Sequence, residues 1–120
     1  MKGSAITERT SASLVKSYRG YRTTGGRCTV RVSGDNTLER PLRLRLDLRN
    51  HSPSGFEWGY GGSGPAQLAL ALLADACGDD ETALRHYQQF KRVVVAGLSD
   101  SWTITDREIR RCIGYHRNES

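Results

Sequence analysis

Two groups of residues in this chain could do chemistry, and the first lies in a glycine-rich turn. Residues 50–73 read NHSPSGFEWGYGGSGPAQLALALL, an aromatic turn that leads into an apolar helix. His51 and Glu57 could act there as general base and acid, and backbone N–H groups ahead of a helix attract anions. The turn is therefore a candidate site for a small molecule or a phosphate. Its residues are His51, Glu57, Trp58, Tyr60, Gly61, Gly62, Ser63 and Gly64.

The same turn lacks a complete catalytic or phosphate-binding signature. Neither Ser52 nor Ser54 sits in a G-x-S-x-G nucleophile elbow. The lysine and the serine or threonine of a phosphate loop are absent, and Pro65 removes one backbone donor. We therefore predict that the protein is not an enzyme. The competing interpretation of the turn is structural, a tight bend that lets the buried helix approach its neighbours.

The second group is a set of arginines. Residues 19–49 contain eight arginines and three acidic residues in a chain of net charge +5, whereas residues 50–100 contain three basic and six acidic residues. Arginine suits bidentate contact with phosphate or carboxylate, and tyrosines interleaved with arginines favour backbone contact together with base stacking. The predicted partner-binding or nucleic-acid-binding residues are Arg19, Arg22, Arg27, Arg31, Arg43, Arg45, Arg49, Tyr18 and Tyr21.

Strands are the elements expected to position these arginines. Residues 17–34 predict two strands joined by a Gly-Gly turn at 25 and 26. In PLRLRLDLRN, at 41–50, leucines alternate with charged residues, which predicts a third strand over 42–49. If this strand pairs with 28–32, the arginines of both strands share one solvent face, where like charges are destabilising unless something negative covers them. The alternative is a solvated face that Glu39, Asp47 and the acidic residues at 79–81 partly neutralise.

The helix that follows the turn is predicted over 65–77. Ser63 or Gly64 would cap it, Pro65 fits its first turn, and Gly78 would end it. Because nearly every residue in it is apolar, we expect it to be central and buried, either within one chain or against a second copy.

Two more helices are predicted further along the chain. One spans 80–97 and begins with acidic residues at its positive end. A short extended piece then precedes a helix near 105–116, in which Thr105 and Glu108 form a capping box and His116 packs inward.

The length of 120 residues suits a single domain. Residues 1–16 are polar and aperiodic, so we expect a loosely ordered N-terminal segment followed by one α+β domain over 17–120. That domain should have a small antiparallel sheet of two to four strands packed on two or three helices, one of them buried. The chain shows no secretory leader and no apolar run long enough to cross a membrane, which predicts a soluble cytoplasmic protein.

The cysteines and histidines give no sign of a metal site or a cofactor. Cys28, Cys77 and Cys112 are widely spaced and form no CxxC pair, which argues against a disulfide framework and against zinc. The three histidines lie at 51, 86 and 116, with no local ligand pair. We therefore expect neither metal nor cofactor.

The string FEWGYGGSGPA followed by LAL resembles the signature of a family of small uncharacterised proteins of bacteria, archaea and their phages and plasmids. The likeness extends from YRGYR at 18–22 to the segment 102–108. The family implies no activity and no catalytic residues. It implies a setting on mobile elements, where small proteins often block host machinery, and this makes an inhibitor of a bacterial CRISPR-type defence one hypothesis.

Together these observations predict a non-catalytic binding protein that contacts its partner through an arginine-rich sheet face. The partner would be a protein or nucleoprotein complex with an acidic or nucleic-acid-binding surface, or nucleic acid itself, and not a membrane. The sequence leaves open whether the chain forms a homodimer. The alternative function is the small-molecule or phosphate site at the aromatic turn.

Overall fold

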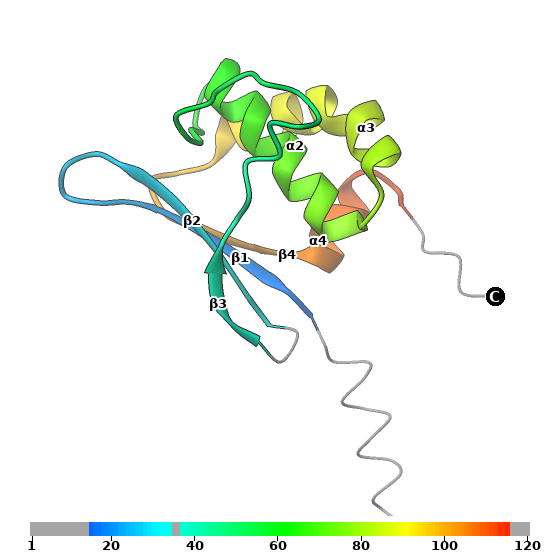
Figure 1. The fold of residues 1–120 in the computed structure, drawn as a ribbon, viewed down its shortest axis with the longest axis horizontal. Helices are drawn as coiled ribbons and strands as arrows, with labels where there is room; N and C mark the ends of the chain where they lie inside the picture. The colour runs from blue at the N-terminus through cyan, green and yellow to red at the C-terminus, as the bar shows by residue number, and fades with distance from the viewer. Residues whose placement is uncertain (1–14, 35–36, 116–120) are drawn as a thin grey trace, which may run out of the picture.

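A computed structural model describes residues 15–34 and 37–115 of the chain. Four antiparallel strands form one sheet in the order β3-β2-β1-β4. The three α-helices lie together on one face of this sheet, and no helix of the described residues lies on the other face (Figure 1). This confirms the predicted α+β fold.

The first two strands form a hairpin, as predicted. β1 (Ser17–Arg22) pairs with β2 (Cys28–Gly34), and Gly26 of the connecting turn has a φ of 86°, a value that favours glycine. β4 (Trp102–Thr105) pairs with the other side of β1. The predicted short extended piece before the last helix is thus an edge strand of the sheet.

The predicted strand over 42–49 is wrong. The third strand, β3 (Thr37–Pro41), lies just before it, and the leucine-rich segment continues as a loop over the helices. Arg45 has a φ of 59°, which lies outside the β region, and the N–H of Leu48 donates to the carbonyl of Arg45 in a turn. The leucine pattern indicates only that one side of the segment is buried. In this loop, Leu42, Leu44 and Leu48 pack against the core.

The apolar helix is the centre of the fold, as predicted. α2 (Ser63–Cys77) is buried along almost its whole length within a single chain, so no second copy is needed to cover it. Gly78 ends it in the left-handed conformation, also as predicted. Its N-terminal cap is Gly62 rather than Ser63 or Gly64, and no side chain caps the helix.

The other two helices are shorter than predicted. α3 (Asp80–Val93) begins after Asp79, whose carboxylate accepts two backbone N–H groups, and it gives way to the short 3-10 helix η1 (Val95–Gly97). α4 (Asp106–Cys112) begins with the predicted Thr105–Glu108 capping box. It ends well before residue 116 because the chain turns at Gly114, with a φ of 68°. The prediction that His116 packs inward concerns a position outside the described residues.

Two polar side chains on α2 connect this helix to the chain around it. The buried amide of Gln67 accepts from two backbone N–H groups and donates to two carbonyls of the 44–52 loop. Asp75 accepts from Lys16, Tyr18 and Arg40. Lys16, the last residue of the predicted N-terminal segment 1–16, is therefore bound to the domain, and residues 1–14 lie outside the described residues.

Within the described part of the chain, no helix has the length and apolar character that crossing a membrane requires.

Candidate functional site

The uncovered face of the sheet is the main candidate surface. Side chains alternate along each strand, so every second residue points away from the helices. In β1 and β2, Arg19 and Arg31 are directly opposite each other. The outward-facing residues are Ser17, Arg19 and Tyr21 of β1, Thr29, Arg31 and Ser33 of β2, Glu39 and Pro41 of β3, and Thr103 of β4.

The charges on this face are arranged around one carboxylate. Glu39 lies 3.2 Å from Nη2 of Arg19 and 3.7 Å from Nε of Arg31. The pair of opposed arginines would otherwise be destabilising, and Glu39 offsets part of that repulsion. Two guanidinium groups sharing one carboxylate keep a net positive charge, and the exposed Arg27 in the β1–β2 turn adds to it.

An aromatic ring lies beside these charges. The guanidinium carbon of Arg19 is 4.9 Å from the centre of the Tyr21 ring, a cation–π contact. Tyr21 also borders a shallow depression of about 440 Å³ between β1 and β4. The residues that line it are Arg19, Gly20, Tyr21, Ser101, Trp102 and Thr103.

Three predicted arginines lie away from this face because the segment 42–49 is not a strand. Arg43 and Arg49 are exposed on the loop. Arg45 is mostly buried and pairs with Asp47 and Asp80, each at 3.0 Å, and hydrogen bonds to these carboxylates raise its pKa. The predicted single face joining these arginines to those of β2 is therefore wrong.

Two further predicted contacts point into the protein. Tyr18 is fully buried, and its hydroxyl donates to Asp75 at 2.7 Å. Arg22 stacks over the ring of Trp58 and donates to the Trp58 carbonyl at 3.0 Å, and its Nη1 lies 2.6 Å from Asp100. Both side chains lie on the side of the sheet opposite Arg19 and Tyr21, and both contribute contacts to the fold.

The aromatic turn also serves the fold. Trp58 is fully buried and meets Trp102 edge-on, with ring centres 5.4 Å apart. A Cβ added to Gly64 would lie 2.5 Å from Cβ of Glu57, so only glycine lets the turn approach the helix this closely. Tyr60, Gly61 and Ser63 are exposed, and Gly62 is partly exposed.

His51 and Glu57 have different partners. Nε2 of His51 is 2.8 Å from the Tyr87 hydroxyl, and the backbone N–H of His51 donates to Gln67. Glu57 instead accepts from the thiol of Cys28 and lies 3.8 Å from Arg22. No hydrogen bond joins the two in the described chain, so they do not form the acid–base pair that the sequence suggested. No group of three metal-ligating side chains occurs among the described residues.

Comparison with protein families matches residues 18–115 to DUF6166, a family of unknown function. The chain belongs to DUF6166. No curated protein and no solved structure matches it. The DUF6166 match runs from β1 to the residues just after α4, so both the sheet face and the aromatic turn lie in the family's domain.

Glu39 neutralises part of this face, as one interpretation of the sequence predicted, whereas the contribution of Thr103 was missed. The interpretation grouped neighbouring residues of 18–22 as one surface, although alternation places Tyr18 and Arg22 on the face opposite Arg19 and Tyr21. Assigning alternate residues of β1 to opposite faces of the sheet would have separated Tyr18 and Arg22 from Arg19 and Tyr21. No sequence signal could have shown that β4 pairs with β1.

A second, smaller pocket of about 210 Å³ in this DUF6166 chain contains a thiol–carboxylate contact. The Cys28 thiol donates to Oε1 of Glu57 at 3.4 Å. Partial burial raises the pKa of Cys28, the nearby Glu57 carboxylate raises it further, and Arg22 opposes the change. The thiolate, which is the reactive form, is therefore disfavoured at neutral pH.

We expect Glu57→Gln to make Cys28 more reactive. The substitution removes the negative charge that holds the proton on the thiol, so alkylation by iodoacetamide at pH 8 should become several-fold faster. The measurement uses a Cys112→Ser background, because Cys112 is exposed whereas Cys77 is buried. Asp100→Asn, which removes an exposed carboxylate that also pairs with Arg22, is the control. An unchanged or slower rate in Glu57→Gln would contradict this account of Cys28.

Proposed function

We propose that this protein is a non-catalytic binding protein whose uncovered sheet face holds single-stranded nucleic acid. The observation that carries the proposal is the placement of Tyr21 beside Arg19, on the sheet face that no described helix covers and next to a depression large enough for a base. Single-stranded sites combine aromatic rings, on which bases stack, with cations that follow the backbone.

The charge arrangement supports phosphate as the group bound by the arginines. Arg19 and Arg31 already share one carboxylate, Glu39, and arginine forms the same bidentate contacts with phosphate oxygens as with carboxylate. A phosphate arriving at this face would compete with Glu39 for the two guanidinium groups. Arg27, exposed in the β1–β2 turn, would add a third positive charge for contact with the phosphate backbone.

A single strand fits this face better than a duplex. Sequence readout of a duplex uses a helix or a β-ribbon inserted into the major groove, and the outward-facing residues here lie on a four-stranded sheet. Unpaired bases, by contrast, can lie flat on an aromatic ring.

The narrower form of the proposal concerns the biological partner. It holds that the protein comes from a phage or mobile element and blocks a host nucleic-acid-associated complex in the cytoplasm, including a CRISPR-type defence complex. Its support is the sequence resemblance together with the basic sheet face. In that case the face would bind the nucleic acid of the complex or the acidic surface beside it.

The alternative, a small-molecule or phosphate site at the aromatic turn, has weaker support. His51 and Glu57 form hydrogen bonds with different residues, Tyr87 and Cys28, and Trp58 is buried in the apolar core. The pocket between Cys28 and Glu57 is the remaining observation in its favour.

We expect Tyr21→Ala to lower the affinity for a labelled single-stranded oligonucleotide about tenfold or more, because one stacked base is worth about 1–3 kcal/mol. Tyr21→Phe should retain most of the affinity, because the ring remains. Glu39→Gln should raise the affinity, because it removes the competing carboxylate. Fluorescence anisotropy with a mixed-sequence oligonucleotide at low salt measures all three.

Charge variants complete the test. Arg19→Ala and Arg31→Ala should weaken binding and reduce its salt dependence. The slope of log affinity against log salt should fall by about 0.7 for each phosphate that the variant no longer neutralises. Arg43→Ala, an exposed arginine on the 42–49 loop, should leave both affinity and slope unchanged. Equal binding by the wild type and Tyr21→Ala would refute the proposed site.

A further inference from the structure

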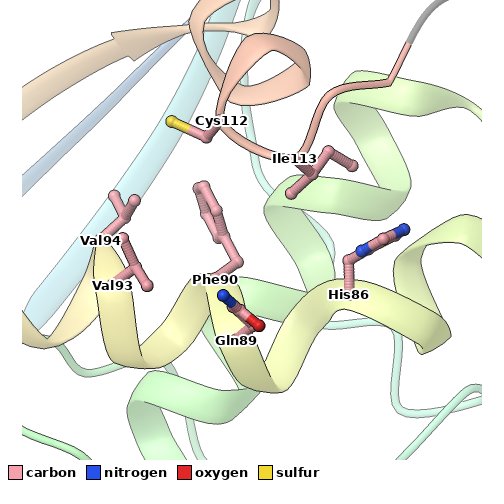
Figure 2. Close-up of a pocket in the computed structure, with 7 residues that line it drawn as sticks. All are labelled: His86, Gln89, Phe90, Val93, Val94, Cys112 and Ile113. Carbon is pink, nitrogen blue, oxygen red and sulfur yellow. The ribbon is translucent and has the colours of Figure 1, made fainter.

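A groove between α3 and α4 forms a second surface, separate from the sheet face. Its volume is about 320 Å³. Figure 2 shows the ring of Phe90 standing between the two helices, with Val93 and Val94 on one side and Cys112 and Ile113 across from them. The lining residues are His86, Gln89, Phe90, Val93, Val94, Cys112 and Ile113, none of which is acidic.

The groove exists because α3 and α4 both pack on α2 and not closely on each other. Arg110 anchors α4 by donating to the Ala76 carbonyl at the end of α2 and pairing with Asp106. α4 then ends at Cys112, so it is too short to cover the end of α3. Val93, the last residue of α3, consequently has 68% of its surface exposed.

An apolar groove between two helices can receive the apolar face of a third helix. Phe90 is almost fully buried and forms the floor, while Val93 and Cys112 stand open at the edge. The opening suits the side chains of a helix, whose apolar residues recur every three or four positions.

Arginines lie next to the groove-lining residues on both helices. Arg85 and Arg92 lie four residues before and three residues after Gln89, so they flank the groove on α3 and are exposed. Arg111 lies beside Cys112 on α4 and is also exposed. The acidic residue nearest in sequence on α4 is Glu108, whose carboxylate already accepts the Thr105 N–H in the capping box.

We propose that this groove docks an amphipathic helix of an acidic protein partner. Apolar side chains of that helix would enter between Val93 and Cys112, over Phe90, and its carboxylates would meet Arg85, Arg92 and Arg111. A second copy of the chain is a poorer occupant, because a two-fold contact would bring both sets of arginines together in a protein of net charge +5.

The test is selection of binders from a displayed library of random peptides of about 16 residues, roughly four and a half helical turns. Enriched peptides should carry apolar residues at helical spacing with aspartate and glutamate on the flanks. Val93→Gln should lower their affinity about tenfold, because a valine side chain loses its burial. Arg92→Gln should lower it several-fold, and more at low salt than at high salt.

Matched controls separate docking from folding. Leu38→Gln replaces another exposed apolar residue, 88% exposed on β3, and Arg49→Gln another exposed arginine. Both controls should bind the selected peptides as the wild type does. The proposal is overturned if neutral or basic peptides are enriched, if no peptide prefers the wild type to Val93→Gln, or if light scattering shows a dimer that Val93→Gln dissociates.

Discussion

Replacing Gln67 with leucine is expected to lower the free energy of unfolding by about 3–5 kcal/mol. The Gln67 side chain is fully buried. Its oxygen accepts the N–H groups of His51 and Ser52 at 2.7 and 2.9 Å. Its nitrogen donates to the carbonyls of Leu44 and Arg49 at 2.7 and 3.0 Å. Leucine has a similar volume and leaves all four backbone groups without this partner, and an unsatisfied buried group costs about 1–3 kcal/mol.

Urea unfolding followed by tryptophan fluorescence measures this loss. Gln67→Glu separates the two halves of the interaction, because a carboxylate can still accept from His51 and Ser52 but cannot donate to Leu44 and Arg49. We expect it to be destabilising as well, since it also places a charge in the core. Gln88→Leu, at an exposed position of α3, should change stability by less than about 0.5 kcal/mol. A loss below about 1 kcal/mol in Gln67→Leu would show that the 44–52 loop does not depend on this amide.

Replacing Asp75 with alanine is the second large expected effect, a loss of about 2–4 kcal/mol. The Asp75 carboxylate receives Lys16 at 2.8 Å, the Tyr18 hydroxyl at 2.7 Å and Arg40 at 3.0 Å, and it is 18% exposed. Removing it leaves the buried Tyr18 hydroxyl and the partly exposed Arg40 without this acceptor. Lys16 loses its ion pair and keeps its hydrogen bond to the Asp75 backbone carbonyl, at 3.1 Å.

The same carboxylate makes stability depend on pH. Burial alone would raise the pKa of Asp75, but the hydrogen bonds from Lys16, Tyr18 and Arg40 outweigh it and lower the pKa below its ordinary value. The folded-state pKa of Asp75 lies below the unfolded-state pKa of about 3.9. The stabilisation by Asp75 is therefore complete above the unfolded-state pKa and is lost as the pH falls through the folded-state pKa. Asp75→Asn should therefore flatten the acid limb of the stability curve. Asp47 and Asp79, whose pKa values are also lowered, keep part of the slope.

Thermal unfolding of wild type and Asp75→Asn between about pH 2 and pH 7 checks this, because the stability difference should shrink on the acid side. Asp100→Asn is the control. Its carboxylate is only 2.6 Å from Arg22 but is 92% exposed, and exposed pairs contribute at most about 1 kcal/mol. A constant difference between wild type and Asp75→Asn at every pH would contradict the assignment.

Much of the fold could be predicted from local patterns. The β1–β2 hairpin, the buried α2 with Gly78 at its end, and the Thr105–Glu108 capping box all follow from interactions within a few residues of each other. Such features depend on backbone preferences and short-range hydrogen bonds, which can be recognised from residue types a few positions apart.

The segment 42–49 shows where this reasoning fails. Its alternating leucines are consistent with a strand, yet Arg45 adopts a left-handed conformation and pairs with Asp80, 35 residues away. The backbone of the loop is bound by Gln67, a residue of a different element. Burial of every second side chain does not require a neighbouring strand, whereas strand pairing does. The alternating leucines therefore indicated burial correctly and the strand incorrectly.

The sequence alone therefore determined that this chain is a basic α+β domain with a buried central helix, because composition and hydrophobic periodicity carry that information. Only the tertiary structure decided which arginines act together. Arg19 and Arg31 share a face because β1 and β2 pair in one register, Arg22 turns inward to Trp58, and Arg45 is held by two aspartates. Long-range pairing and burial set these positions, and neither can be read from residues that are neighbours in the chain.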